Sequence, residues 1–137
     1  MVTRVLDTSV VAKWFFDEER TDRAVALLED LLAGDARIHV PSSLFYELAN
    51  VVWSRRGPAF TEQQAREVWA ELMTLPLSVT DESAVLPEAL TFAFQHGVTV
   101  YDAVFVVLAR QVGCDLVTDD RTLWKQVAAD CGWVKRL

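Results

Sequence analysis

Short apolar runs alternate along the chain with longer stretches in which apolar residues recur every three or four positions. The short runs are typical of buried strands, and the longer stretches are typical of helices. The predicted strands are residues 4–6, 37–40, 76–79, 114–118 and 133–137. The predicted helices are residues 8–16, 22–34, 41–53, 61–73, 82–96, 100–113 and 119–132. Strands that alternate with helices predict an α/β fold, with a parallel sheet of four to five strands covered on both faces.

Residues that favour helix ends stand at several predicted boundaries. Gly34 closes the second predicted helix, as glycine does where the chain takes a left-handed turn. Thr61 and Gln64 have the spacing of a capping box, which predicts a helix start at this point. The stretch 55–60, RRGPAF, separates this helix from the preceding one. We therefore expect the two helices to form a protruding pair.

Residues 100–113, VYDAVFVVLARQVG, form an unusually apolar predicted helix. After Asp102 the helix meets no further charge until Arg110, and apolar residues occur on every side. Such a helix is predicted to be buried all round. A carboxylate at its start is costly unless it is solvated, paired or bound to a cation.

The composition predicts one globular domain spanning residues 1–137. Apolar residues make up 52% of the 137 residues and charged residues 24%, which excludes a disordered or fibrous chain. No apolar run approaches the roughly 18 residues of a membrane span, and no leader pattern opens the chain. We expect a cytoplasmic protein with no membrane partner. Cys114 and Cys131 are too few for a disulfide framework or a thiolate zinc site, so both are predicted to be reduced thiols.

Carboxylates follow two of the predicted strands. Asp7 comes directly after the first strand, and Asp119 and Asp120 come after the strand that ends at Thr118. Ligands of open α/β sheets bind beyond the carboxyl ends of the strands. If the crossover rule sets the strand order, these acids stand at the ends of neighbouring strands. Glu47 joins them as a candidate, because helical geometry places it at the border of an apolar helix face.

A gathering of carboxylates has a physical consequence. Like charges that close repel one another by several kcal/mol in a poorly solvated cleft, which raises pKa values or requires divalent cations. Oxygen ligands suit Mg²⁺ or Mn²⁺ and not zinc. The net charge of −7 argues against a protein that coats nucleic acid by charge alone, so any contact with nucleic acid needs metal. The alternative is that these acids are helix caps, a role that aspartate fills well.

Four stretches of the chain carry a family resemblance. They are VLDTSVVAKWFFDEE (5–19), PSSLFYELANVV (41–52), VTVYDAVFVVLARQVGCDLVTDD (98–120) and RTLW (121–124). Together they are similar to VapC-type PIN-domain proteins, the toxin halves of prokaryotic toxin–antitoxin pairs. The resemblance implies a three-layer α/β/α fold and an acidic pocket that binds Mg²⁺ or Mn²⁺ to hydrolyse RNA phosphodiester bonds.

The same resemblance implies roles for individual residues. The catalytic, metal-binding acids fall on Asp7, Glu47, Asp102 and Asp120. Asp119 fills a variable middle position, which leaves it as a rival or helper to Asp120. Supporting hydroxyls fall on Thr8, Ser9 and Thr118.

Several basic and aromatic residues are candidates for contact with RNA. Lys13 and Arg121 rank first, because they lie within two turns of Asp7 and Asp120. Arg20, Arg55, Arg56 and Lys125 are further candidates. Ordinary surface exposure is the alternative for all six basic residues. Trp14 and Tyr101 could stack on a base, as aromatic residues do in single-strand binders, but core packing is expected for both.

The resemblance also implies partners: an RNA substrate, a small VapB-like antitoxin and a second copy of the chain in a homodimer. The alternative function is a non-catalytic protein-binding module of PIN-like fold whose acids cap helices. Two other acid-centred α/β classes are less well matched. An aspartate-nucleophile phosphatase usually needs Asp-x-Asp after its first strand, where this chain has Ser9, and a receiver domain needs paired acids.

Overall fold

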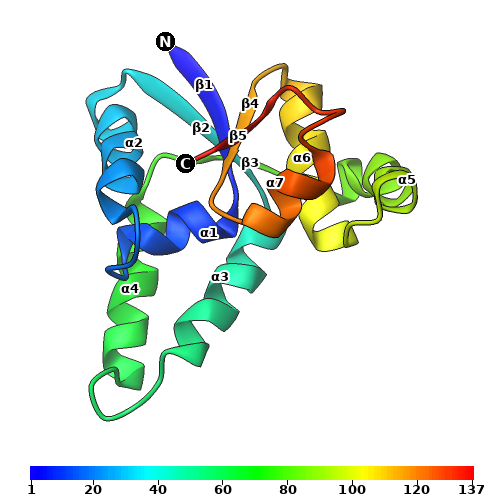
Figure 1. Cartoon of the computed structure of the whole chain (residues 1–137). Helices are drawn as coiled ribbons and strands as arrows, with labels where there is room; N and C mark the ends of the chain where they lie inside the picture. The colour runs from blue at the N-terminus through cyan, green and yellow to red at the C-terminus, as the bar shows by residue number, and fades with distance from the viewer.

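The computed structural model describes all 137 residues and has a five-stranded sheet at its centre (Figure 1). All strand pairs are parallel, and the order is β3-β2-β1-β4-β5. The strands are β1 (Val2–Leu6), β2 (Ala36–Pro41), β3 (Ser78–Thr80), β4 (Asp115–Thr118) and β5 (Val134–Arg136). The predicted parallel sheet is therefore confirmed. Its first and fourth strands are neighbours, which brings their carboxyl ends together.

Helices cover both faces of the sheet, as right-handed crossovers require (Figure 1). The helices are α1 (Thr8–Val11), α2 (Thr21–Ala33), α3 (Ser43–Ser54), α4 (Glu62–Thr74), α5 (Leu86–His96), α6 (Val100–Val112) and α7 (Arg121–Val127). Two 3-10 turns, η1 (Ala12–Trp14) and η2 (Glu82–Ala84), precede α2 and α5. The resulting three layers match the predicted α/β/α architecture.

Three predicted helices are shorter than the sequence pattern indicated. The helix predicted over 8–16 tightens into the 3-10 turn η1, where the N–H groups of both Phe15 and Phe16 donate to the carbonyl oxygen of Ala12. The helix predicted over 82–96 begins at Leu86, because Pro87 fits only in a first turn. The last helix ends at Val127, where the N–H of Asp130 bonds the Val127 carbonyl oxygen and turns the chain.

The helix predicted over 41–53 begins only at Ser43, because Pro41 is the last residue of β2. The ends predicted at Gly34, Thr61 and Gly97 are confirmed. Thr61 and Gln64 form a complete capping box at the start of α4. Gly34, Gly97 and Gly113 follow α2, α5 and α6 in left-handed conformation, which glycine adopts without strain.

Helix α6 is the centre of the core. Every residue from Ala103 to Ala109 is buried, and the helix packs on β1, β2 and β4. This confirms the prediction of a helix buried all round. Because α6 is fixed on three strands, its first turn and Asp102 have a fixed position relative to the carboxyl ends of β1 and β4.

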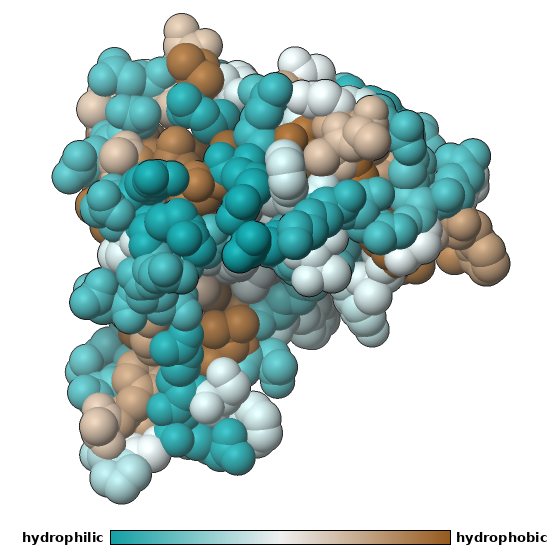
Figure 2. All heavy atoms as spheres, viewed as in Figure 1, coloured by the Kyte–Doolittle hydropathy of each residue, from teal (hydrophilic) through white to brown (hydrophobic).

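The helices α3 and α4 protrude from the body as an antiparallel pair (Figure 1). Apolar side chains remain visible between the two arms (Figure 2), where a groove of about 670 Å³ is lined by Val52, Trp53 and Trp69 among others. Trp53 is 58% exposed, whereas the other four tryptophans are partly buried against the core.

Both cysteines are free thiols, as predicted; Cys131 is buried and Cys114 is partly buried. No single helix has the length and apolar character needed to cross a membrane. Only α5 and α6 taken together reach that length and composition, with a bend of 113° between them.

Candidate active site

Asp7 lies at the carboxyl end of β1, where the strand turns into α1. Its side chain caps this helix by accepting from the backbone N–H of Ser9 at 3.1 Å. The carboxylate is nevertheless nearly closed off from water, with 7% of the residue exposed. This burial raises the pKa of Asp7 to about 6, although hydrogen bonds from Ser9 and Thr118 oppose the rise. An aspartate that only capped a helix would not need to be buried at this cost.

Two hydroxyl groups hold the Asp7 carboxylate from opposite sides. Ser9 Oγ donates to Asp7 Oδ1, and Thr118 Oγ1 donates to Asp7 Oδ2, each at 2.5 Å. Thr118 reaches Asp7 because Leu6 and Val117 are partners in the β1–β4 ladder. Each carboxylate oxygen therefore has a fixed orientation; Oδ1 accepts both the N–H and the hydroxyl of Ser9, whereas Oδ2 accepts only Thr118 and has a further lone pair to offer.

Glu47 extends from α3 toward the same region. Thr8, the first residue of α1, donates its hydroxyl hydrogen to Glu47 Oε2 at 2.7 Å. Burial raises the pKa of Glu47, and the charges of Asp102 and Asp7 raise it further. Glu47 is thus partly buried among other acids, and it lies inside its helix, where it caps nothing.

Asp102 and Asp120 complete the group of acids. Burial raises the pKa of Asp102, and the charge of Asp120 adds to this rise. Asp120 caps α7 by accepting from the N–H of Leu123 at 3.0 Å, and its own N–H donates to Thr118 Oγ1 at 3.0 Å. The predicted acids from four remote segments are therefore close enough to repel one another. This electrostatic coupling joins Asp7 with Asp102, Glu47 with both, and Asp102 with Asp120.

The four carboxylates are not arranged as a complete set of metal ligands. As the side chains stand, no three His, Cys, Asp or Glu side chains lie close enough together to hold a metal ion. Two of the carboxylates are engaged by other partners, Glu47 by the Thr8 hydroxyl and Asp120 by the Leu123 N–H. Side-chain rotation would be needed to gather them around an ion. The oxygen-only donor set and the unrelieved repulsion both suit a hard divalent cation.

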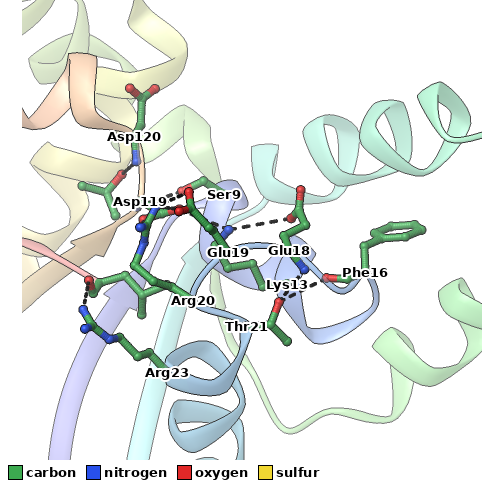
Figure 3. A network of polar contacts seen from close by, with 12 residues as sticks. Ser9, Lys13, Phe16, Glu18, Glu19, Arg20, Thr21, Arg23, Asp119 and Asp120 are labelled. Carbon is green, nitrogen blue, oxygen red and sulfur yellow. Dashed lines mark hydrogen bonds and ion pairs between the residues drawn. The ribbon is translucent and has the colours of Figure 1, made fainter.

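The two adjacent aspartates after β4 have different surroundings. Asp119 accepts from Arg20 Nε at 2.7 Å and from Arg20 Nη2 at 3.1 Å, and Lys13 Nζ lies 3.1 Å from Asp119 Oδ2 (Figure 3). The Arg20 and Lys13 charges hold the pKa of Asp119 below its usual range. Asp120 points away from this network in Figure 3. Asp119 is therefore engaged by cations, whereas Asp120 is left to interact with Asp102.

The candidate RNA contacts have equally different environments. Lys13 is buried and paired with Asp119, and Arg20 and Arg55 are paired with Asp119 and Glu18. Arg121 is exposed and makes no ion pair. The pairings with Asp119 join segments about a hundred residues apart and that of Arg55 with Glu18 spans 37 positions, so sequence spacing could not have revealed them.

The predicted core packing holds for one of the two aromatic residues near the acids and fails for the other. Trp14 packs against the core and donates its indole N–H to the Ala24 carbonyl oxygen at 2.8 Å, as predicted. The prediction that Tyr101 packs in the core is wrong, because this side chain is 70% exposed. Tyr101 lies in the first turn of α6, where the helix emerges from the core.

The model of the PIN domain matches residues 4–130 of this sequence. This chain belongs to the PIN domain family. It is 36% identical over 129 residues to Ribonuclease VapC3 of Pyrobaculum aerophilum, a match that covers 91% of this chain and 95% of that protein. The resemblance to VapC-type PIN-domain proteins is confirmed, and membership of this family removes the phosphatase and receiver-domain alternatives.

Solved structures of other proteins agree with the fold. VapBC2 from Rickettsia felis, bound to a DNA fragment from its promoter, superposes with a TM-score of 0.68 at 16% identity, covering 99% of both chains. VapC20 of Mycobacterium tuberculosis, described as a toxin that cleaves the sarcin–ricin loop, gives a TM-score of 0.69 at 16% identity. That match covers 93% of this chain and 95% of VapC20. At these identities the superpositions establish the fold of the PIN domain.

Proposed function

We propose that this PIN domain protein is a divalent-metal-dependent endoribonuclease that hydrolyses RNA phosphodiester bonds. The observation that carries the proposal is the coupling of four carboxylates from remote segments around the buried Asp7. The sequence identity to a protein named as a ribonuclease supports the choice of RNA as substrate.

Asp7, Glu47, Asp102 and Asp120 would hold the cation, Mg²⁺ or Mn²⁺. When bound, such a cation lowers the pKa of water and neutralises charge on the phosphate and on the leaving oxygen. The protein needs no nucleophilic side chain for this chemistry.

The remaining residues of the site position these acids. Ser9 and Thr118 fix the Asp7 carboxylate, and Thr8 holds Glu47. With a pKa of about 6, Asp7 is mostly ionised at neutral pH and is ready to bind a cation. Below this pH it binds a proton instead, so activity should fall as the solution becomes acidic.

We also propose partners and a cellular location for this protein. We infer that the chain is the toxin of a VapBC-type pair, bound by a small VapB-like antitoxin, because the matched structures include a VapBC complex. A homodimer and a cytoplasmic location, where RNA is available and thiols stay reduced, complete this proposal.

Purified Asp7→Asn and Asp102→Asn variants test the catalytic assignment. Each should keep the wild-type circular dichroism spectrum but lose Mn²⁺-dependent cleavage of RNA by at least about 100-fold. Asp81→Asn is the matched control, because Asp81 also caps a turn, accepting from the Ser83 N–H at 2.9 Å, but lies outside the acid group. Undiminished cleavage by either site variant would remove that residue from the mechanism.

A second candidate function is a non-catalytic binding module whose acids are helix caps. The caps formed by Asp7 and Asp120 favour it. It does not account for Glu47, which caps nothing, or for the burial of Asp7. Under this alternative, divalent cations should leave the RNA intact and the melting temperature unchanged.

A further inference from the structure

A second pocket adjoins the acids on the side of η1 and α3. Its volume is about 530 Å³. The polar and charged residues that line it include Thr8, Ser9, Lys13, Glu18, Arg55 and Asp119. Unlike the groove between α3 and α4, it is lined mainly by polar and charged side chains.

The pocket is continuous with the candidate active site through two hydroxyl residues. Ser9 lines the pocket and donates to Asp7, and Thr8 lines it and donates to Glu47. A strand of nucleic acid with one phosphodiester at the acids would therefore have a neighbouring linkage within reach of the pocket.

Two cations of the pocket share one carboxylate. Glu18 Oε2 lies 2.6 Å from Arg55 Nη2, and Glu18 Oε1 lies 3.8 Å from Lys13 Nζ (the Lys13 contact is drawn in Figure 3). Lys13 is only 6% exposed, and the Arg55 guanidinium lies 4.7 Å from the centre of the Phe16 ring. Both cations are thus held in place. Lys13 is poorly hydrated as well, a condition that strengthens its attraction for an anion, whereas Arg55 is exposed and open to an incoming ligand.

The charges in the pocket are not fully balanced without Glu18. Asp119 accepts two hydrogen bonds from Arg20 in addition to its contact with Lys13, so Arg20 alone could neutralise it. Glu18 is the only acid paired with Arg55. If Glu18 moved away, Lys13 and Arg55 would face the pocket with a combined positive charge. The two oxygens of Glu18 occupy a position between two cations that the two non-bridging oxygens of a phosphodiester could take.

We propose that this pocket is a phosphate subsite for single-stranded RNA, in which Lys13 and Arg55 bind a phosphodiester next to the one that is cleaved and Glu18 occupies the subsite until RNA displaces it. This inference rests on the proposed ribonuclease function and adds the residues that draw RNA to an otherwise acidic protein. The net charge of −7 makes such a local pair of cations necessary for affinity.

Binding of a fluorescent ten-nucleotide single-stranded RNA in EDTA tests the subsite apart from cleavage. Glu18→Gln removes the competing charge and should tighten binding by about fivefold, whereas Arg55→Gln should weaken it by about fivefold. Arg55→Gln should also lower the slope of log affinity against log salt by about 0.7, the value for one lost phosphate contact on a single strand. The matched controls are Glu62→Gln and Arg66→Gln, which alter an exposed Glu–Arg pair on α4 at 3.3 Å and should change binding little.

The inference is overturned if Glu18→Gln and Arg55→Gln bind RNA no differently from their controls, or if Glu18→Gln shows no binding in EDTA. The outcome is separable from that of the proposed function. If the protein cleaves RNA in Mn²⁺ but the Glu18 and Arg55 variants bind RNA as their controls do, the ribonuclease function stands and the phosphate subsite is refuted. If the variants show the expected changes in binding but the wild type cleaves no RNA in Mn²⁺, the subsite stands and the ribonuclease function is refuted.

Discussion

Thr118 donates its hydroxyl hydrogen to Asp7 across the β1–β4 ladder, at 2.5 Å, and so joins residues 111 positions apart in the sequence. The same hydroxyl oxygen accepts the N–H of Asp120 at 3.0 Å. One fully buried side chain thereby orients two of the acids that we assign to the site. The geometry of the acids depends on the pairing of two neighbouring strands.

Replacing Thr118 with valine removes this hydroxyl while keeping the shape of the side chain. The Thr118 hydrogen bond lowers the pKa of Asp7, so Thr118→Val should raise it above about 6. The acidic limb of the pH–rate profile for RNA cleavage should move to higher pH. Ser42→Ala serves as a control, because the Ser42 hydroxyl accepts from the N–H of Glu82 outside the site. An unchanged acidic limb would show that Thr118 does not tune Asp7.

Because the pKa of Asp7 is raised, we expect the stability of the metal-free protein to depend on pH. Because folding raises this pKa from 3.8 to about 6, the native state binds the proton more tightly than the unfolded chain does. The stabilisation from protonated Asp7 is complete below pH 4 and is lost as the pH rises through 6. In EDTA, the wild type should therefore lose this stabilisation between pH 4 and pH 8, whereas Asp7→Asn should not. The free energy of unfolding of Asp7→Asn relative to the wild type should rise by up to about 3 kcal/mol over this range.

Urea unfolding of both proteins at the two pH values measures this gain. A difference between variant and wild type that stays constant from pH 4 to pH 8 would contradict the assignment of a raised pKa to Asp7.

The neighbours Asp119 and Asp120 should respond differently to the same substitution. Asp119→Asn leaves the buried Lys13 without its closest counterion and should lower the free energy of unfolding by about 2 kcal/mol at pH 7. The loss should shrink in acid, because the pKa of Asp119 is lowered in the folded state and its stabilisation disappears as the pH falls through that value. Asp120→Asn keeps its helix cap, so it should spare stability and abolish cleavage.

Chemical denaturation and an RNA cleavage assay on the two variants separate these roles. If Asp119→Asn abolished cleavage with stability intact, the assignment of the fourth acid would pass from Asp120 to Asp119.

Divalent cations should stabilise the folded chain. A ligand that binds only the native state raises stability by mass action, so Mn²⁺ at about 100 times its dissociation constant should add about 2.7 kcal/mol. The shift in melting temperature should be lost in Asp102→Asn and kept in the control Asp81→Asn. An equal shift in all three proteins would indicate that the cation binds elsewhere.

Features that depend on local sequence pattern and on general rules of topology could be predicted from the sequence. Alternating apolar runs predicted the sheet, the all-round apolar character of residues 100–113 predicted a buried α6, and the crossover rule placed Asp7 beside the acids after β4. Tertiary contacts decided the rest. The pairing of Lys13 with Asp119 and the bond from Thr8 to Glu47 join distant segments and depend on side-chain rotamers, which no sequence spacing fixes. The exposure of Tyr101 depends on where α6 leaves the core.

A crystal structure with Mn²⁺, located by its anomalous scattering, tests the central claim most directly. We expect at least one strong peak among the carboxylates of Asp7, Glu47, Asp102 and Asp120, with the Glu47 and Asp120 side chains rotated toward it. Oxygen ligands at about 2.0 to 2.2 Å would agree with a hard divalent ion. A saturated crystal with no anomalous peak at these carboxylates would contradict the account.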